Sequence, residues 1–456
     1  DNNLIAFFDN KKSIVGSKIG GIIVYDLELI EKIILKKKIN VLLISDQNIS
    51  NKLNKNLLNY IEKFNIEVKK SPNLDHFINY YTTLKLKDIS IEDILGRKPI
   101  KPNPKLLYQD IKNKIVLVTG AGGSIGTQLC LQIIKNNPKI LILLELSEYN
   151  LYKINNELIS YKIKYKLDTK IVPIIGSIQN KNKLNKIFKT FNLNTVYHTA
   201  AYKHVPLIEM NIFEGIKNNV YGTKLIVEIS VKYKVNKFIL ISSDKAVRPT
   251  NYMGATKRVA EILCLLENKK QKNTTFSIVR FGNVLESSGS VVPLFKKQIL
   301  SGGPVTVTDP KIERYFMTIQ EASELVIQAG SMAKNNGEIF ILDMGKRIKI
   351  LKLAEQMIRL NGNVPTFNKK VMDQSNLKHI LIEFIGLRPG EKLIEELVYN
   401  TKIIKTKHPR IMKTKDPLNY VVDLEKNIFN LISHCKNDDF TKTLNTLKKI
   451  DNNFNF

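Results

Sequence analysis

Apolar and polar positions alternate along the first 71 residues in a pattern that predicts a small α/β unit. Residues 21–26 (GIIVYD) form an apolar run typical of a strand, and residues 27–38 repeat apolar side chains at helical spacing. The order continues with a strand at 40–45, a helix at 51–64 and a strand at 66–71. This order predicts a small parallel sheet with helical crossovers. Because it contains no glycine-rich phosphate turn, we expect a scaffolding or regulatory domain.

A polar stretch with three prolines, residues 96–114, separates this unit from a longer alternation. Prolines at such spacing continue neither a helix nor a central strand, so we place a domain boundary near residue 100. Six further apolar strands follow, with helical patterns between them, at residues 114–120, 139–146, 170–176, 194–200, 237–243 and 276–282. Strands at this spacing predict a doubly wound parallel sheet of the Rossmann type.

From residue 283 the chain becomes irregular, with loops such as SGGPVTVTD and GLRPGEK between short helical patterns. This composition is typical of a substrate-covering lobe built over the carboxyl edge of a sheet. The predicted fold class is therefore α/β, with a Rossmann-like domain at 1–100, a Rossmann domain at 101–282, a smaller substrate lobe at 283–415 and C-terminal helices at 416–456.

Composition places the chain among soluble globular proteins. Its 456 residues, 43% hydrophobic and 25% charged, are enough for two or three domains with real cores. No run approaches the ~18 to 20 uncharged apolar residues of a membrane-spanning helix. The chain begins DNNLIAFFDN, with neither a methionine nor the apolar core of a signal peptide, so we expect an upstream segment to be missing.

The net charge of +29 raises the question of an anionic partner. However, the lysines are spread over nearly every segment and arginine is scarce, whereas patches that bind phosphates favour the two-pronged guanidinium of arginine. We therefore interpret the charge as solvated faces and compositional bias, expect no nucleic-acid partner, and keep an anionic surface as the alternative.

Cysteine and histidine positions argue against a metal site. Cys130, Cys264 and Cys435 are far apart and form no CxxC pair, which excludes a disulfide framework and fits a reducing compartment. The six histidines show no ligand spacing such as HxxxH. We expect no metal.

A glycine-rich turn follows the first strand of the longer alternation. In VTGAGGSIGTQLC, the spacing of Gly120, Gly123 and Gly126 allows a tight turn, close backbone approach to a pyrophosphate and tight packing of helix on sheet. Glu145 follows 19 residues after Gly126. An acidic side chain at that strand end accepts a hydrogen bond from a ribose 2′-hydroxyl and repels a 2′-phosphate, so we predict NAD rather than NADP as cofactor.

Later strand ends add candidates. Ser177 stands where many such folds carry an aspartate beside the adenine, and its hydroxyl can still form a hydrogen bond. Ala200 and Ala201 are small enough to let a dinucleotide lie against the backbone. Lys203 and His204 are candidates for contact with substrate, with an ordinary solvated loop residue as the alternative for each.

Seven segments, taken in order, resemble the nucleotide-sugar 4,6-dehydratases of polysaccharide biosynthesis, within the extended short-chain dehydrogenase/reductase superfamily. They are TGAGGSIG, AAYKHVP, SSDKAVRPTNYMGATKR, RFGNVLESSGSVVPLFKKQI, GGPVTVTDPKIERYFMTI, ILDMG and GLRPGEKLIEEL. The resemblance covers about residues 90 to 400. The preceding segment resembles the domain that follows transmembrane helices in long members such as the UDP-N-acetylglucosamine 4,6-dehydratases of bacterial glycan pathways. It implies a homo-oligomer at the cytoplasmic face of the inner membrane, anchored by a segment missing here.

The reaction implied by this resemblance transfers a hydride from sugar C4 to NAD, eliminates water across C5 and C6, and returns the hydride to C6. It needs a base near the C5 proton and an acid for the departing C6 hydroxyl. Ser243, Asp244 and Lys245 stand at a strand end, where sites of this fold assemble. By resemblance, Asp244 is the acid and Lys245 the base. Because a lysine base must be neutral, we expect burial or the charges of Lys203 and Lys257 to lower the pKa of Lys245.

The helix that follows departs from the pattern of shorter relatives, which carry a tyrosine four residues before the active-site lysine. Here Met253 holds that position before Lys257, and Tyr252 lies off the shared helical face, as a bystander. By resemblance, Lys257 binds the nicotinamide ribose, and the methionine marks the long members and suggests retention at C5. Which group takes the proton of the 4-hydroxyl stays open. The candidates are Asp244, a water and a ribose relay through Lys257.

The resemblance also gives binding residues. For the substrate they are Lys203, Asn283, Arg314, Arg388 and Glu391, with Arg314 at the diphosphate and Arg388 and Glu391 at the nucleotide end. The cofactor set is Gly120, Gly123, Ser124, Ile125, Gly126, Glu145, Ser147, Ser177, Ile178, Ala200, Ala201, Tyr202 and Lys257. Glu286 and Glu313 depart from the family pattern and place negative charge near the expected anionic ligand.

We therefore expect an NAD-dependent UDP-N-acetylglucosamine 4,6-dehydratase. A nucleotide-sugar 4-epimerase is the enzymatic alternative, although it needs no base at C5. A non-catalytic nucleotide-sugar sensor, with Met253 as the mark of lost activity, is the alternative from another class.

Overall fold

The computed structural model describes residues 3–44, 61, 64, 66–70, 87–88, 100–285, 287, 289–334, 337–368, 378–399, 401–415, 423–451 and 454. The chain divides into two compact units. The smaller consists of Asp1–Lys98, Leu294–Pro310 and Ile350–Ile385, and the larger of Pro99–Pro293, Lys311–Lys349 and Gly386–Phe456.

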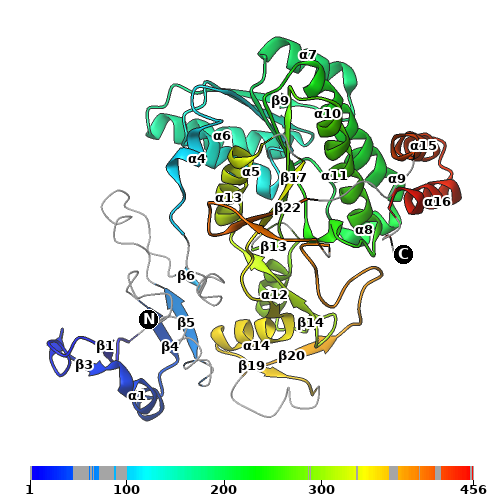
Figure 1. The fold of residues 1–456 in the computed structure, drawn as a ribbon. Coiled ribbons are helices and arrows are strands. Elements are labelled where there is room, and N and C mark those ends of the chain that lie inside the picture. The colour runs from blue at the N-terminus through cyan, green and yellow to red at the C-terminus, as the bar shows by residue number, and fades with distance from the viewer. Residues whose placement is uncertain are drawn as a thin grey trace. The chain divides into compact units, whose positions relative to one another are not determined.

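A nine-stranded sheet forms the centre of the larger unit (Figure 1). Its order is β21-β22-β17-β12-β11-β10-β7-β8-β9. The seven strands from β17 to β9 are parallel, and β22 and β21 continue the sheet antiparallel. The strands are β7 (Ile115–Thr119), β8 (Ile140–Glu145), β9 (Lys170–Ile175), β10 (Thr195–His198), β11 (Lys237–Ile241), β12 (Thr275–Arg280), β17 (Glu338–Leu342), β21 (Ile404–Lys405) and β22 (Ile411–Lys415).

The six strands expected from the sequence are β7 to β12, and their parallel pairing confirms the doubly wound α/β fold. The sheet is larger than expected, because β17, β21 and β22 come from the region after residue 283. Two-residue pairs add small sheets in this unit, β13 (Asn283–Val284) with β16 (Phe316–Met317) and β15 (Glu313–Arg314) with β18 (Ile348–Lys349).

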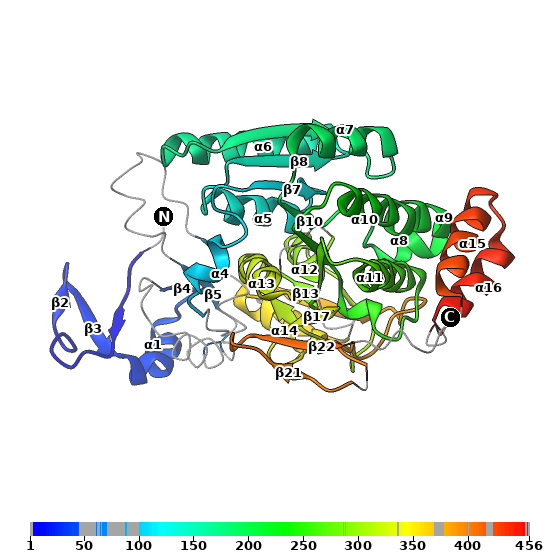
Figure 2. The same cartoon turned by 45° about the horizontal axis from the view of Figure 1, so that its top comes forward.

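Helices cover both faces of the sheet (Figure 2). The described helices of this unit are α4 (Pro104–Tyr108), α5 (Ser124–Ile134), α6 (Glu148–Lys164), α7 (Lys181–Phe191), α8 (Val205–Met210), α9 (Ile212–Gly215), the π-helix η4 (Ile216–Gly222), α10 (Thr223–Lys232), the short 3-10 helix η5 (Asp244–Ala246), α11 (Tyr252–Lys270), α13 (Ile319–Met332), α15 (Leu424–Lys436) and α16 (Phe440–Ile450).

Two apolar cores correspond to the two faces. Phe238 and Leu240 of β11 join the core made with α7, α10 and α11, whereas Ile239 and Ile241 join the core made with α5, α6 and α13. Successive side chains of a strand point to opposite faces, so a strand buried on both sides is apolar throughout. This burial explains why these strands are continuous apolar runs in the sequence.

The described residues of the smaller unit form three three-stranded sheets, ordered β1-β3-β2, β4-β5-β6 and β14-β20-β19. Its elements are β1 (Phe7–Asp9), β2 (Lys18–Ile19), β3 (Ile22–Asp26), η1 (Leu27–Leu29), α1 (Ile30–Lys37), β4 (Val41–Ile44), β5 (Glu67–Lys70), β6 (Lys87–Asp88), β14 (Val305–Val307), α14 (Ile350–Leu360), β19 (Val364–Thr366) and β20 (His379–Phe384), with α12 (Val291–Leu300) spanning the division between the units.

The sequence predicted one small parallel sheet for the N-terminal region, and the described strands form two. β4 and β5 pair in parallel as expected, but β3 pairs with β1 and β2 instead. The helix expected at residues 51–64 lies mostly outside the described residues. A core of Ile30, Ile34 and Val68 also takes in Leu360 of α14, so the N-terminal segment is completed by a distant part of the chain.

No helix within the described ranges has both the length and the apolar character needed to cross a membrane.

Candidate active site

The glycine-rich turn after β7 requires glycine at the ends of its motif. Gly120 has φ +64°, and a Cβ there would lie 2.8 Å from the Cα of Ala200. A Cβ on Gly126 would lie 2.0 Å from the carbonyl oxygen of Gly120. Both contacts are shorter than real Cβ atoms make, so the close packing of β7, α5 and the loop after β10 depends on these two glycines.

The N-terminus of α5 offers an anion site. Gly123 is its N-cap residue, and no side chain caps the helix there. A Cβ on Gly123 would meet only the carbonyl oxygen of Gly120, at 3.3 Å, so the space beside it is open to a ligand. Backbone N–H groups and the positive end of the helix dipole favour a phosphate at such a position. The turn therefore fits the pyrophosphate of a dinucleotide.

Glu145 ends β8 and holds the turn in place. One of its carboxylate oxygens accepts a hydrogen bond from the N–H of Gly122 at 2.9 Å. The other accepts from the N–H groups of Leu146 and Ser147, at 2.9 and 3.0 Å. Ser147 in turn caps α6. Glu145 thus lies beside the turn, as a ribose-binding acid should, and its contact with a 2′-hydroxyl stays a prediction.

Asn219, which no sequence pattern singled out, fixes the loop after β10. It accepts a hydrogen bond from the N–H of Tyr202 at 2.8 Å and donates to the carbonyl of the same residue at 2.9 Å. It also donates to the hydroxyl of Thr256 on α11, at 2.9 Å. Asn219 belongs to the π-helix η4, and such irregular turns occur often at functional sites. The loop with Ala200, Ala201 and Tyr202 is therefore held in one conformation.

Other predicted residues lie at neighbouring strand ends. The hydroxyl of Ser177 accepts from the N–H of Gln179 at 3.1 Å, and the buried Ile178 packs against Gly222. Lys203 and His204 are exposed, and the ring of His204 lies against Gly289, where a Cβ would be 2.5 Å from it. Their contact with a ligand stays a prediction.

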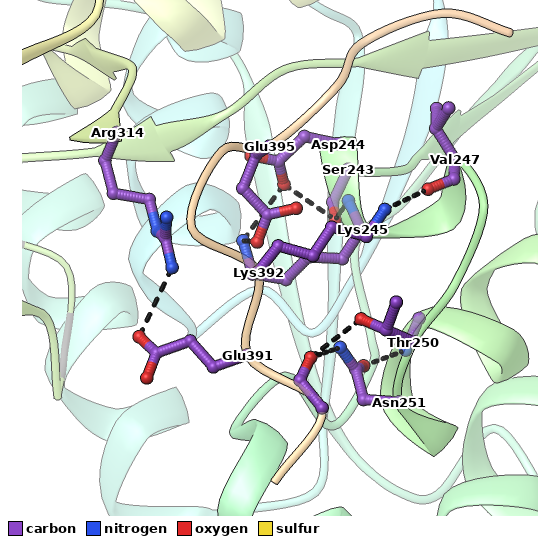
Figure 3. A network of polar contacts seen from close by, with 12 residues as sticks. Ser243, Asp244, Lys245, Val247, Thr250, Asn251, Arg314, Glu391, Lys392 and Glu395 are labelled. Atoms are coloured by element: carbon purple, nitrogen blue, oxygen red, sulfur yellow. Dashed lines mark hydrogen bonds and ion pairs between the residues drawn. The ribbon is translucent and has the colours of Figure 1, made fainter. Parts of the chain in front are cut away.

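Ser243, Asp244 and Lys245 follow β11 and form the centre of the candidate site (Figure 3). The hydroxyl of Ser243 accepts from the N–H of Lys245 at 2.9 Å and donates to Asp244 Oδ1 at 3.3 Å. Asp244 is 2% exposed, and its Oδ1 lies 3.1 Å from Lys245 Nζ. The predicted acid and base are therefore direct hydrogen-bond partners.

The expectation that the pKa of Lys245 is lowered is wrong for this structure. Burial lowers it, but the negative charges of Asp244 and Glu395 outweigh burial, so the pKa lies above its ordinary value. Glu395 Oε1 is 3.3 Å from Lys245 Nζ. The cation that acts on this lysine is Arg314, in place of the two lysines expected from the sequence. Lys245 thus rests as an ammonium between two carboxylates.

Burial has the opposite consequence for Asp244. Burial and then the charge of Glu395 raise its pKa, the charge of Lys245 lowers it, and the net result lies above the ordinary value. A carboxyl group with a raised pKa can hold a proton and deliver it to a leaving group. The environment of Asp244 therefore suits the predicted acid.

Lys257 lies on α11, which begins at Tyr252 beside the site. Asn251 caps this helix by accepting from the N–H of Gly254 at 2.8 Å. A Cβ on Gly254 would lie 2.3 Å from the carbonyl oxygen of Lys245, so this glycine allows the helix to approach the loop. Lys257 Nζ donates to the carbonyl of Ile241, the last residue of β11, at 3.0 Å, and burial lowers its pKa to about 8.

Met253, one turn before Lys257, is buried with 3% of its surface exposed. Its thioether has no proton to exchange. Beside it, the N–H of Tyr252 donates to Glu209 Oε1 at 2.7 Å, which fixes the start of the helix.

The predicted phosphate-binding arginine is held inside the protein. Arg314 is 6% exposed and donates to the carbonyls of Glu313 and Leu393, at 2.9 and 3.0 Å. Its other terminal nitrogen lies 3.2 Å from Glu391 Oε1. Glu391 Oε2 accepts from the N–H of Arg388 at 3.2 Å. Arg314 and Glu391 are therefore brought together, a pairing the sequence did not predict.

Asn283 begins β13, half-buried, and the side chain of Arg388 is exposed. Their substrate contacts stay predictions. Glu286, which departs from the family pattern, lies outside the described residues.

Comparison with known proteins places this geometry in context. The family described as "Polysaccharide biosynthesis protein" matches residues 116–416. The capsular polysaccharide biosynthesis protein CapD of Staphylococcus aureus is 46% identical over 384 residues, which cover 84% of this chain. The chain spans 60% of the length of that relative.

Relatives from two enzyme classes have the same sequence identity to this chain. A UDP-glucose 4-epimerase of Rickettsia bellii is 31% identical over 73% of this chain and 93% of its own length. A UDP-N-acetylglucosamine 4,6-dehydratase (inverting) of Campylobacter jejuni is 31% identical over 62% of this chain and 77% of its own length. Among solved structures, the X-ray structure of Pen from Bacillus thuringiensis aligns with a TM-score of 0.58 at 35% identity, over 68% of this chain and 90% of that one.

Proposed function

Because the chain belongs to the polysaccharide biosynthesis protein family, we propose that it is an NAD-dependent UDP-N-acetylglucosamine 4,6-dehydratase. Its product is a UDP-2-acetamido-2,6-dideoxy-hexos-4-ulose. The observation that carries the proposal is the hydrogen-bonded pair of Asp244 and Lys245 at the carboxyl end of β11. An acid and a base in one place suit an elimination, which must take a proton from C5 and give one to the C6 hydroxyl.

The cofactor part of the proposal rests on the turn after β7. Gly120 and Gly126 shape the turn, Gly123 leaves room beside the helix N-terminus, and Glu145 lies beside the turn, where it would bind the ribose. When bound, NAD would accept the C4 hydride and return it to C6. The acid at the end of β8 supports NAD over NADP, because its charge repels a 2′-phosphate.

The chain's own residues would supply the proton transfers. Lys245 takes the C5 proton after the C4 ketone has made it acidic, and Asp244 protonates the departing C6 hydroxyl. Lys257, fixed by the carbonyl of Ile241, lies on the adjoining helix and would hold the nicotinamide ribose. Since Met253 has no proton to exchange, the proton of the 4-hydroxyl would leave through Asp244, a water or the ribose and Lys257.

A 4-epimerase is the second candidate, because a 4-epimerase from Rickettsia bellii is as similar as the dehydratase relative. Epimerisation reverses a hydride transfer at C4 and needs no base at C5. An epimerase would therefore need only a group that takes the 4-hydroxyl proton, whereas elimination uses both Asp244 and Lys245. This difference in the need for a C5 base favours dehydration.

One incubation separates the candidates. The protein is mixed with NAD and UDP-N-acetylglucosamine in heavy water, and the product is analysed by mass spectrometry and NMR. We expect a product lighter by one water, with deuterium at C5, and the NMR spectrum then gives the configuration at C5. UDP-N-acetylgalactosamine as the product would establish epimerisation, and unchanged substrate, bound without turnover, would indicate a sensor.

A further inference from the structure

Glu395 is a buried carboxylate that the sequence did not mark and that contacts the proposed base directly. Its side chain is 4% exposed, and its Oε1 lies 3.3 Å from Lys245 Nζ. Asp244 Oδ1 lies 3.1 Å from the same nitrogen. Figure 3 shows both carboxylates meeting one ammonium. Glu395 belongs to the segment after GLRPGEK, about 150 residues further along the chain than the lysine it contacts.

Contacts on either side of Glu395 fix its position. Lys392 Nζ donates to the carbonyl of Val247 at 2.9 Å, and Glu396 pairs with Arg248 at 2.7 Å. Both partners lie in the loop that carries Lys245. A segment tied at two points to this loop presents the residue between them to the lysine in one arrangement, as a preorganised site requires.

The three groups in direct contact carry more negative than positive charge, because Asp244 and Glu395 contribute two carboxylates and Lys245 one ammonium. Lys392, whose Nζ donates to the carbonyl of Val247, faces the same two carboxylates, and burial lowers its pKa. Among the described residues, Asp244 Oδ2 and Glu395 Oε2 are buried and have no hydrogen-bond partner. A buried unpaired oxygen costs folding free energy, so its retention points to a use in the chemistry of the site.

We propose that Glu395 is a positioning residue, which holds Lys245 Nζ beside Asp244 and retains in that pair the single proton that elimination uses. This inference rests on the proposed dehydratase function. The guanidinium of the nearby Arg314 is bonded to Glu391 and to two carbonyls, and its charge lowers the pKa of both Asp244 and Lys245.

The proton count supports this role. Protonated Asp244 with neutral Lys245 carries one proton, as does ionised Asp244 with the Lys245 ammonium. The two forms interconvert by moving a proton along the 3.1 Å hydrogen bond between them. Lys245 then takes the C5 proton, the C5–H electron pair forms the C5–C6 double bond, the C6–O bond breaks, and Asp244 protonates the hydroxyl, which leaves as water.

As a carboxylate, Glu395 opposes loss of the shared proton to solvent through its charge. Besides burial, which raises the pKa of Asp244 and lowers that of Lys245, the charge of Glu395 raises the pKa of both groups. Without that charge, the buried lysine would lose its proton at a lower pH. The pair would then be an ionised acid beside a neutral base, which cannot protonate the leaving hydroxyl.

The first test needs no turnover. Lys245 is one-fifth exposed, so a small amine-labelling reagent can reach it, and its labelling can be followed by peptide mass spectrometry as pH rises. We expect Glu395→Gln to move the midpoint of Lys245 labelling down by about one pH unit, a tenfold change in proton affinity. Glu395→Asp should keep the midpoint near that of the wild type. Glu214→Gln is the matched control, because Glu214 is 54% exposed and pairs with Lys217, outside the cluster.

The second test reads the same change in catalysis. In Glu395→Gln, the alkaline limb of the kcat profile for UDP-N-acetylglucosamine should move down by about one pH unit, while KM changes less than about threefold. Glu395→Asp should restore the position of the limb. An unchanged labelling midpoint in a folded Glu395→Gln variant overturns the proposal, as does a shifted midpoint with an unchanged kcat profile. If the midpoint shifts in Glu395→Gln but the wild type forms no dehydrated product, the contact is confirmed. The proposed function is then overturned, and with it this role of Glu395 in elimination.

Discussion

Two buried ionic clusters in the larger unit differ in what their carboxylates contact. The site cluster consists of Asp244, Lys245 and Glu395. The scaffold cluster consists of Arg258, Glu261, Arg280 and Asp451, which are all fully buried. In the site cluster two carboxylate oxygens have no partner among the described residues, whereas Glu261 uses both of its oxygens in several hydrogen bonds.

The scaffold cluster balances its charges and satisfies its central carboxylate. Glu261 accepts from Arg280 at 2.7 and 2.6 Å, from Arg258 at 3.2 Å and from Ser242 at 2.6 Å. Arg258 also donates to Asp451 at 2.9 Å, which ties the C-terminal segment to α11. Burial raises the pKa of Glu261, but the charges and hydrogen bonds of the two arginines and Ser242 outweigh it, and the pKa lies below its ordinary value.

The opposite pKa shifts of Glu261 and Asp244 separate a role in stability from a role in proton transfer. A carboxyl group with a lowered pKa is stabilised as an ion and does not exchange protons near neutral pH. Asp244 has a raised pKa and a partner with which it can exchange a proton. Ser242 donates to Glu261 of the scaffold cluster and Ser243 to Asp244 of the site cluster, so two adjacent residues serve the two roles.

The largest effect should follow loss of the base. Lys245→Ala removes the group that takes the C5 proton, and we expect kcat for dehydration to fall by about a thousandfold or more, the upper range for a general base. Product formation is measured by mass spectrometry. Lys270→Ala on α11 is the matched control, because Lys270 is 45% exposed and pairs with Glu267 away from the site. If Lys245→Ala formed product at the rate of the wild type, the site cluster would have no catalytic role to distinguish it from the scaffold cluster.

The scaffold cluster should respond in stability instead. Glu261→Gln leaves two buried arginines without their shared carboxylate, and we expect the free energy of unfolding to fall by about 3 to 5 kcal/mol. Denaturant unfolding followed by circular dichroism measures the change. Asp451→Asn breaks the ion pair with Arg258 but leaves Glu261 in place, and should lose less. Asp244→Asn, the corresponding change in the site cluster, should alter the free energy of unfolding by about 1 kcal/mol or less and abolish activity.

The pH dependence of this contribution has a defined sign. Because the folded pKa of Glu261 is below its unfolded value of about 4.3, its contribution to stability is complete above that pH and is lost as pH falls through the folded pKa. The unfolding free energy of Glu261→Gln should therefore approach that of the wild type in acid. A difference that stays constant down to acid pH would contradict the ionic account.

The sequence predicted the strands better than the contacts between distant segments. The strands β7, β8, β11 and β12 are buried on both faces, and the continuous apolar runs that result are visible in any short window of the chain. Asp244 and Lys245 follow such a strand, and their roles were assigned by the resemblance to the 4,6-dehydratases. Glu395 was missed, although its segment was recognised, because its contact with Lys245 depends on the tertiary fold. The wrong expectation for the pKa of Lys245 has the same cause.

The smallest effect is expected at Met253. This residue lies in the sequence between Lys245 of the site cluster and Arg258 of the scaffold cluster, and its side chain is buried, as are those of the scaffold cluster. If its role is packing, Met253→Leu, which conserves volume, should keep kcat within about threefold. Met253→Ala should keep measurable turnover while losing about 2 to 3 kcal/mol of unfolding free energy through the cavity it leaves. Turnover is measured with the dehydration assay and stability by denaturant unfolding. Loss of all activity in a folded Met253→Ala variant would contradict a packing role, because a thioether that exchanges no proton would then have to act on substrate or cofactor through its shape.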